Sequence, residues 1–286
     1  MKTAQTPVGV TDLIPEEASE YTVIIGKVVT VLTKNKYELV RTPTIEYYDS
    51  LSNGMGPNLQ KKAIKFVDTS GKVVTLRPDN TLAVARLVAT RLQDRKRPLK
   101  LYYGAPVFRT PDPLTNQDTE RFQVGLEYIG KDGPKVDAEI IKILIDSIKA
   151  TGIKDFGIDI GHVDFVKGLS KAKKDALIQG NYVALGEIPK RGGKELLTKN
   201  KNLKTCLTSL KKDGYDKYVT INKGLVKDLH YYTGIIFDVY VGKTKVSVAS
   251  GGRYDNLLSK YGDASPAIGF AININRVIRE LAEQVK

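Results

Sequence analysis

The stretch LKLYYGAPVFRTPDPLTNQDTERFQVGLEYIG, residues 99–130, decides how this chain folds. Its two ends, LKLYYGAPVFR and RFQVGLEYIG, are rich in the aromatic and β-branched residues that favour strands. The polar segment 110–120 lies between them and predicts a connecting loop. The stretch therefore predicts a pair of long strands joined by that loop.

Further strands follow the same pattern. Residues 65–78 predict a hairpin with Ser70 and Gly71 in its turn, and residues 37–43 predict a strand that stops at Pro43. Additional strands are predicted over 155–162, 217–224, 235–242 and 245–252, and at the start of 266–286. Among these, Val246–Ala249 is expected to pair with Ile235–Val241 through a turn at Gly242, Lys243 and Thr244.

Helices are predicted between blocks of strands rather than after each strand. Residues 14–35 form an amphipathic pattern that begins with Pro15, Glu16 and Glu17, which suit a first helical turn. Similar patterns cover 80–94, 135–152 and the end of 266–286. This order indicates an α+β fold with a mostly antiparallel sheet, not a doubly wound one.

Composition narrows the class of protein. The chain has 286 residues, of which 41% are hydrophobic and 27% charged, as in folded globular proteins. It contains no apolar run long enough to span a membrane, and its start lacks the apolar core of a signal peptide. One cysteine and two histidines exclude an internal disulfide and argue against a Cys/His metal site. We therefore expect a cytoplasmic protein with no metal and no cofactor.

The formal charge of +13 is concentrated in one segment. Residues 163–214 hold twelve basic and five acidic residues and have a helical pattern, which predicts a small basic helical insertion. One interpretation is a nucleic-acid surface. The other is a lysine-rich, well-solvated surface, and it is favoured because the segment has few aromatic residues for base stacking.

Polar residues on strands and at strand ends are the candidates for a binding site. Gln123, Gly125 and Glu127 alternate on one strand face, which suits a ligand that approaches the sheet closely, although a solvated face would look the same. Arg109 follows an apolar strand and could bind a carboxylate or phosphate, or form an ordinary ion pair. The other candidates are Arg77, Asp79, Tyr231, Tyr232 and Arg253. The sequence has no GxxxxGK[ST], GxGxxG, GxSxG or HExxH motif.

Eight segments in order resemble a known family: GVTDLIPEEA, VRTPTIEYYDSL, TLRPDNTLAVARLVATRL, KLYYGAPVFR, FQVGLEYIG, LHYYTGIIFDVY, SGGRYDNLL and AIGFAININRVI. Together they resemble class II aminoacyl-tRNA synthetases of the histidyl type. The chain looks most like the synthetase paralogues that serve as regulatory subunits of ATP phosphoribosyltransferase. The resemblance implies one class II synthetase-like domain over residues 1–286, an antiparallel sheet flanked by helices with the 163–214 insertion, and no anticodon-binding domain.

The resemblance also implies a histidine-binding site. In this sequence Asp79, Thr81 and Gln123 would hold the amino group of histidine, and Glu127 and Tyr232 would face its imidazole ring. Arg109 would meet the carboxylate of histidine and, in a synthetase, the α-phosphate of ATP. Lys227 and Tyr231 complete the expected site.

Departures from the synthetase pattern argue against catalysis. Pro111, Gln117, Lys227 and Asp228 stand where the family has residues that bind ATP or activate the amino acid, and His230 replaces an aspartate. Asn273 and Asn275 replace a glycine and a glutamate, whereas Arg276 survives. We therefore expect no catalytic residues, a structural or pocket-lining role for His230 and a structural role for His162.

The resemblance implies a non-catalytic regulatory subunit that activates a short-form catalytic subunit and takes histidine as its effector. It would dimerise through its first helix and strand within a hetero-octamer that holds four catalytic chains. Specific tRNA binding is not expected. The alternatives are a truncated histidyl-tRNA synthetase-like domain that activates histidine with ATP, and an RNA-binding relic.

Overall fold

The computed structural model describes residues 5–111, 118–178, 181–196, 200–227, 231–242 and 247–284. The helices are α1 (Pro15–Lys34), α2 (Tyr48–Ser52), α3 (Pro57–Lys62), α4 (Asn80–Arg91), α5 (Pro134–Thr151), α6 (Lys171–Ile178), α7 (Tyr182–Leu185), α8 (Lys201–Lys212) and α9 (Ile274–Gln284). The strands are β1 (Glu38–Leu39), β2 (Ile45–Tyr47), β3 (Lys65–Val67), β4 (Val73–Leu76), β5 (Leu99–Phe108), β6 (Glu120–Ile129), β7 (Phe156–His162), β8 (Arg191–Gly192), β9 (Val219–Asn222), β10 (Ile235–Val241), β11 (Ala249–Arg253) and β12 (Ala267–Asn273). Short 3₁₀ turns lie at Val163–Phe165, Lys194–Leu196, Asp216–Tyr218 and Leu258–Lys260.

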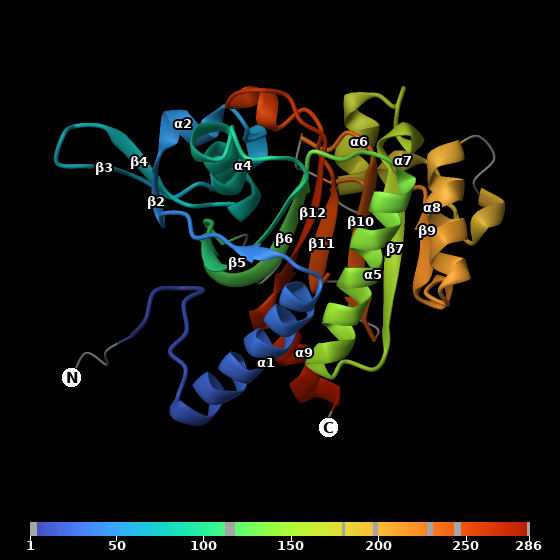
Figure 1. Cartoon of the computed structure of the whole chain (residues 1–286), viewed down its shortest axis with the longest axis horizontal. Coiled ribbons are helices and arrows are strands. Elements are labelled where there is room, and N and C mark those ends of the chain that lie inside the picture. The colour runs from blue at the N-terminus through green and yellow to red at the C-terminus, as the bar shows by residue number, and fades with distance from the viewer. Residues whose placement is uncertain are drawn as a thin grey trace.

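A large sheet runs through the molecule (Figure 1). In the described residues it has nine strands in the order β1-β5-β6-β12-β11-β10-β7-β9-β8. The pairs from β5 to β7 are all antiparallel, and parallel pairs occur only between β1 and β5 and between β7 and β9. A smaller sheet has the order β2-β4-β3 and contains the predicted hairpin. The prediction of a mostly antiparallel α+β fold is confirmed.

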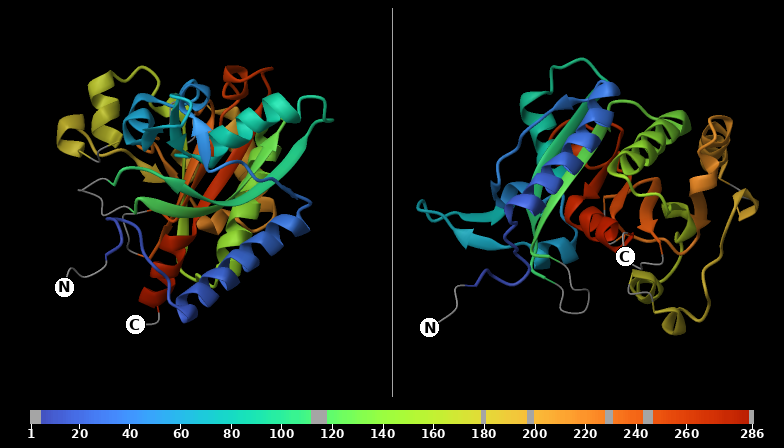
Figure 2. Two further views of the ribbon diagram at one scale, coloured as in Figure 1. Left: turned by 90° about the vertical axis from the view of Figure 1, so that its left-hand side faces the viewer. Right: turned by 90° about the horizontal axis from the view of Figure 1, so that it is seen from below.

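Helices pack on both faces of the large sheet. Figure 2 shows α1 and α9 on one side and α4 on the other. The larger core, which includes Val28, Leu126 and Leu144, lies under α1 and α5, and the smaller core includes Leu82 and Leu101. Neighbouring strand residues enter different cores because successive side chains point to opposite faces. The face of β6 that carries Gln123 and Glu127 is thereby turned toward α4.

The first predicted strand is shorter than expected, since β1 covers only Glu38–Leu39 of residues 37–43. The cause is Arg77, which is 1% exposed. Its Nη1 donates to the carbonyl oxygens of Thr42 and Pro43, each at 2.9 Å, while Nε and Nη2 donate to the Pro106 carbonyl. The Thr42 and Pro43 carbonyls accept hydrogen bonds from the buried guanidinium rather than from a neighbouring strand. Arg77 is therefore structural.

Two further predictions need correction in detail. The 163–214 segment is mainly helical, but it also adds β8, which pairs with β9, and Arg191 of β8 bonds both carboxylate oxygens of Asp159 at 2.5 and 2.7 Å. The partner of β10 begins at Ala249 rather than at Val246, because the observed register pairs Val239 with Ala249. Residues 243–246, which include most of the predicted turn, lie outside the described residues.

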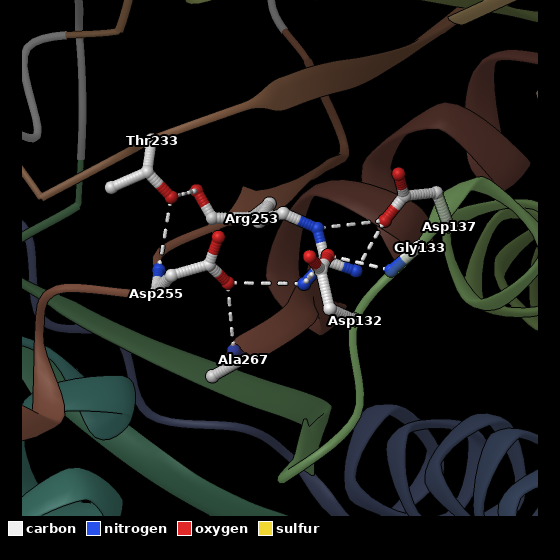
Figure 3. Close-up of polar contacts among 7 residues, drawn as sticks. All are labelled: Asp132, Gly133, Asp137, Thr233, Arg253, Asp255 and Ala267. Atoms are coloured by element: carbon white, nitrogen blue, oxygen red, sulfur yellow. Dashed lines mark hydrogen bonds and ion pairs between the residues drawn. The ribbon is translucent and has the colours of Figure 1, made fainter. Parts of the chain in front are cut away.

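Arg253, at the end of β11, connects three segments that are distant in the sequence (Figure 3). Its guanidinium bonds Asp137 Oδ1 at 3.0 and 2.5 Å, Asp255 Oδ1 at 3.0 Å and Asp132 Oδ1 at 3.2 Å. Asp255 Oδ1 also accepts from the Ala267 amide at 3.0 Å. The side chain of Arg253 is 6% exposed. One arginine thus fixes the start of α5 and β12 against β11.

We expect Arg253→Gln to lower the free energy of unfolding by about 3–5 kcal/mol, because it leaves buried and clustered carboxylates without their cation. Urea denaturation at neutral pH measures this loss. Arg95→Gln is the matched control, since Arg95 is 57% exposed in its pair with Glu38 and should change stability by less than about 1 kcal/mol. A similarly small effect at Arg253 would contradict the prediction.

Candidate functional site: a polar pocket on the sheet

A pocket of about 380 Å³ opens on the α4 side of the large sheet. Its floor is formed by β6, β11 and β12, and its walls come from the start of α4, the end of β5 and the residues that precede β10. The polar residues that line it are Asn58, Lys62, Asp79, Thr81, Arg109, Arg121, Gln123, Lys227, Tyr231, Tyr232, Ser247, Ser250, Tyr254, Asn273 and Arg276. Seven of the eight residues expected to bind histidine therefore line one cavity, and Glu127 is the exception.

Asp79 forms the acidic end of the pocket. It caps α4, where its Oδ1 accepts from the Leu82 amide at 3.2 Å, and this explains why the helix begins at Asn80. Arg109 Nη2 lies 3.4 Å from Asp79 Oδ2, and Arg109 Nε donates to the Pro78 carbonyl at 2.7 Å. Burial raises the pKa of Asp79, and Arg109 opposes that rise. The Asp79 carboxylate and the Arg109 guanidinium form a loose ion pair, and both residues line the cavity.

Glu127 lies directly behind the pocket wall. It is 1% exposed, and its carboxylate accepts from Thr81 Oγ1 at 2.7 Å and from the hydroxyl of Tyr254. Burial raises the pKa of Glu127 to about 8, and the nearby carboxylate of Asp79 adds to this effect. Strand alternation placed Glu127 on the correct face, but Thr81 and Tyr254 stand between it and the cavity.

Aromatic rings form one wall. The ring centroids of Tyr231 and Tyr232 are 4.9 Å apart, and Tyr231 meets Tyr254 edge-on at 5.8 Å. Gln123 Oε1 accepts from Asn80 Nδ2 at 3.1 Å, which orients the amide. Sequence reasoning missed Tyr254 and Asn80, although both stand beside predicted residues in the segments SGGRYD and LRPDNT.

Arg121 and Arg276 form the opposite, cationic end, and Arg109 stands between that end and Asp79. Arg109, Arg121 and Arg276 all line the pocket, and the pKa of Arg121 is lowered to about 9 by burial and by the other two arginines. Arg276 Nη1 donates to the Ser247 carbonyl at 2.6 Å, and Arg121 Nε donates to the Asp118 carbonyl at 2.8 Å. Clustered guanidinium groups favour an anion. Arg121 was not predicted, although it precedes Gln123 in the same alternation.

Lys227 does not offer an uncompensated charge to a ligand. Its Nζ forms an ion pair with Asp238 of β10 and donates to Ser250 Oγ at 3.0 Å. Ser250 in turn donates to Asp238 Oδ1 at 2.6 Å. Asp238 is 4% exposed, so this pair is largely buried. The ammonium group thus balances a buried carboxylate at the pocket floor.

Asn275, one of the departures from the synthetase pattern, is turned away from the pocket. Its Oδ1 accepts from the Tyr21 hydroxyl of α1 at 3.2 Å and from the Phe122 amide of β6 at 2.9 Å. Asn273 does line the pocket, and its Oδ1 accepts from the Arg276 amide at 3.2 Å. The Asn275 side chain therefore connects α9 to α1 and to β6.

The remaining predicted positions divide between structural and undescribed residues. His162 Nδ1 accepts from the Asp164 amide at 3.1 Å and caps a 3₁₀ turn, as expected for a structural histidine. Pro111 is exposed, whereas Gln117, Asp228 and His230 lie outside the described residues.

Within the described part of the chain, no cluster of His, Cys, Asp and Glu has the arrangement of a metal site. None of the helices in that part is both long and apolar enough to cross a membrane.

Comparison with known proteins gives a consistent result. A family model described as histidyl-tRNA synthetase matches residues 9–185 and 184–277. ATP phosphoribosyltransferase regulatory subunits of Halothermothrix orenii and Thermoanaerobacter pseudethanolicus are 34% and 35% identical. Each alignment covers 98% of this chain, and they cover 76% and 83% of the two relatives, respectively.

Solved structures extend the comparison. A Bacillus halodurans protein described as an ATP phosphoribosyltransferase regulatory subunit/histidyl-tRNA synthetase has a TM-score of 0.87 and 29% identity. The match covers 98% of this chain and 83% of that one. The apo histidyl-tRNA synthetase of S. aureus has a TM-score of 0.74 at 24% identity, over 99% of this chain and 71% of that one, and supports the fold alone. The class II synthetase-like fold expected from the sequence is confirmed.

Proposed function

The chain belongs to the histidyl-tRNA synthetase family and, within it, to the regulatory subunits of ATP phosphoribosyltransferase, and from this we infer that it regulates that enzyme. The function is to activate a short-form catalytic subunit in the first step of histidine biosynthesis. The observation that carries this conclusion is the match along 98% of the chain to proteins of that name. A cytoplasmic location follows from the same role.

Histidine is the effector that we propose for the pocket. A free amino acid is a zwitterion, with an ammonium and a carboxylate on neighbouring carbon atoms. Asp79 and Arg109 present the complementary charges side by side, and their separation of 3.4 Å leaves both able to bind a ligand. Aromatic and hydroxyl groups of Tyr231, Tyr232 and Tyr254 suit a polar ring next to that zwitterion.

Several features support a non-catalytic role. Transfer of an adenylyl group needs fixed cations on the phosphates. Arg109 and Arg276 remain in the pocket, but Lys227 is already neutralised by Asp238, and Asn275 is turned toward α1 and β6. We therefore propose a pseudo-synthetase that binds the amino acid without activating it.

Self-association through α1 is part of the proposal. Val23 is 52% exposed on this helix, and a Cβ placed on Gly26 would meet no atom within 4 Å. A glycine in a helix interior costs about 1 kcal/mol relative to alanine, and no contact with the described residues offsets that cost. A second copy of the chain packed closely against this face of α1 would explain why a glycine stands at position 26. The resulting dimer would take its place in a hetero-octamer with four catalytic chains.

The central test is reconstitution of ATP phosphoribosyltransferase activity. Activity should rise at least about tenfold when this chain is mixed with a short-form catalytic subunit, and histidine should then inhibit the mixture. Asp79→Asn should weaken that inhibition by about tenfold, because a charged hydrogen bond to the ammonium is lost while the helix cap is retained. The catalytic subunit alone is the control. If mixing does not activate it, the proposed function is wrong.

The rival function, activation of histidine with ATP, predicts a different outcome. We expect no histidine-dependent exchange of pyrophosphate into ATP by the isolated chain, for the reasons given for Lys227 and Asn275. A histidyl-tRNA synthetase assayed in parallel provides the positive control. Exchange at about 1 per second or faster, within tenfold of an ordinary enzyme, would establish the rival.

Light scattering at micromolar concentration tests the dimer. The wild-type chain should have the mass of a dimer, and Val23→Glu should shift it toward the monomer by burying a charge in the contact. Val183→Glu is the matched control, because Val183 is 93% exposed on α7. Gly26→Ala should weaken the association, whereas on a free helix face it would only stabilise the fold by about 1 kcal/mol. A wild-type monomer at all concentrations would contradict self-association.

A further inference from the structure

Glu127 and Asp79 are two buried carboxyl groups on the same side of the pocket, 1% and 6% exposed. Asp79 has Arg109 beside it at 3.4 Å. The groups that act most strongly on Glu127 are Thr81, Tyr254, Tyr103 and Asp79, and none of these is a cation. Asp79 thus has a guanidinium partner, whereas the hydrogen-bond partners of the Glu127 carboxyl group among the described residues are hydroxyl groups.

The surroundings of Glu127 leave little room for solvent to compensate its charge. A Cβ built on Gly269 of β12 would overlap Glu127 Oε2, so the carboxyl group packs directly on that strand. Thr81 Oγ1 and the Tyr254 hydroxyl bond its two oxygens from α4 and from the residue after β11. Tyr103 of β5 and Tyr232 are also close enough to Glu127 for its charge to contribute to their raised pKa values. Burial raises the pKa of each of these tyrosines, so none carries charge at neutral pH.

A buried carboxylate without a cation gains a proton more readily than one in water. Burial raises the pKa of Glu127 to about 8, which leaves the group largely protonated at pH 7. A ligand ammonium placed between Asp79 and Thr81 brings the missing positive charge to this end of the cavity. It therefore favours the ionised form of Glu127.

We propose that ligand binding in this pocket is coupled to release of a proton from Glu127. This inference rests on the proposed role of histidine as the pocket ligand. The O–H bond of the Glu127 carboxyl group breaks, its electron pair stays on the carboxylate, and the proton leaves through the Tyr254 hydroxyl, which lines the cavity, to the buffer. The ligand ammonium replaces the proton, so the net charge of the acidic end is unchanged.

The coupling sets the sign of the pH dependence. Because the bound state favours the ionised carboxyl group, histidine affinity rises with pH up to about 8, by as much as about tenfold per unit, and then levels off. The imidazole of free histidine titrates near 6.5 and its α-amino group loses its proton at higher pH, so the difference between the wild type and Glu127→Gln from about pH 7 to 8.5 isolates the contribution of Glu127. Feedback by histidine would accordingly weaken as the pH falls within that window.

Calorimetry with L-histidine in buffers of different ionisation enthalpy counts the released protons. At pH 7 we expect the wild type to release about one proton more per bound histidine than Glu127→Gln, and at pH 9 only about a tenth of one more, because the ligand's own groups contribute equally to both proteins. Tyr254→Phe should extend this excess to higher pH, because the Tyr254 hydroxyl stabilises the ionised form. Glu46→Gln is the matched control, since Glu46 is a buried glutamate that keeps Arg86 as its cation at 2.8 Å, and it should leave the release unchanged.

Infrared difference spectra provide a second measurement that does not depend on binding. The ligand-free wild type at pH 7 should show the C=O band of a protonated carboxylic acid, and Glu127→Gln should lack it. Histidine binding with equal proton release by the wild type and Glu127→Gln overturns the coupling while the proposed function stands. Absence of that band also overturns the coupling. If L-histidine does not bind the chain or its complex at all, the histidine role in the proposed function fails as well.

Discussion

The register between β6 and β12 is the constraint on which the pocket depends. It pairs Gln123 with Asn273, Gly125 with Ala271 and Glu127 with Gly269. A side chain on Gly269 would overlap the carboxylate of Glu127, and one on Gly125 would overlap the Phe270 carbonyl and the Tyr103 hydroxyl. A slip of one residue would turn this polar row into the apolar core under α1 and α5. The glycines are therefore required by the packing of the strands themselves.

Charge is arranged along the pocket in a definite order. Asp79 and Glu127 lie at one end, Arg121 and Arg276 lie at the other, and Arg109 stands between them. The buried pair of Lys227 and Asp238 adds no net charge to either end. A ligand with a cationic and an anionic group therefore has one preferred orientation, set by electrostatic complementarity rather than by shape alone. The proposed recognition of an amino acid uses this order of charges, while Lys227 is engaged with Asp238.

Much of the fold and part of the site could be predicted from sequence. Alternation in β6 assigned Gln123 and Glu127 to one face because strand periodicity depends only on local residues. Alternation predicts on which face of the strand a side chain lies but not how deeply it is buried. It therefore could not show that Thr81 and Tyr254 stand between Glu127 and the cavity. The pairing of Lys227 with Asp238 depends on strand geometry across the sheet. The short β1 likewise depends on Arg77, whose carbonyl partners lie about thirty residues away in the chain.

Asn275 has a consequence for the evolutionary history of such a chain. Its amide oxygen is the acceptor for both the Tyr21 hydroxyl and the Phe122 amide. A glutamate at this position whose carboxylate turned into the pocket would leave those two donors without a partner, at a cost of about 1 kcal/mol or more for each. That cost would arise at once, while any catalytic gain would also require changes at Lys227 and its neighbours. A glutamate at position 275 would therefore first lower stability, so the asparagine found there is harder to replace than its exposure alone suggests.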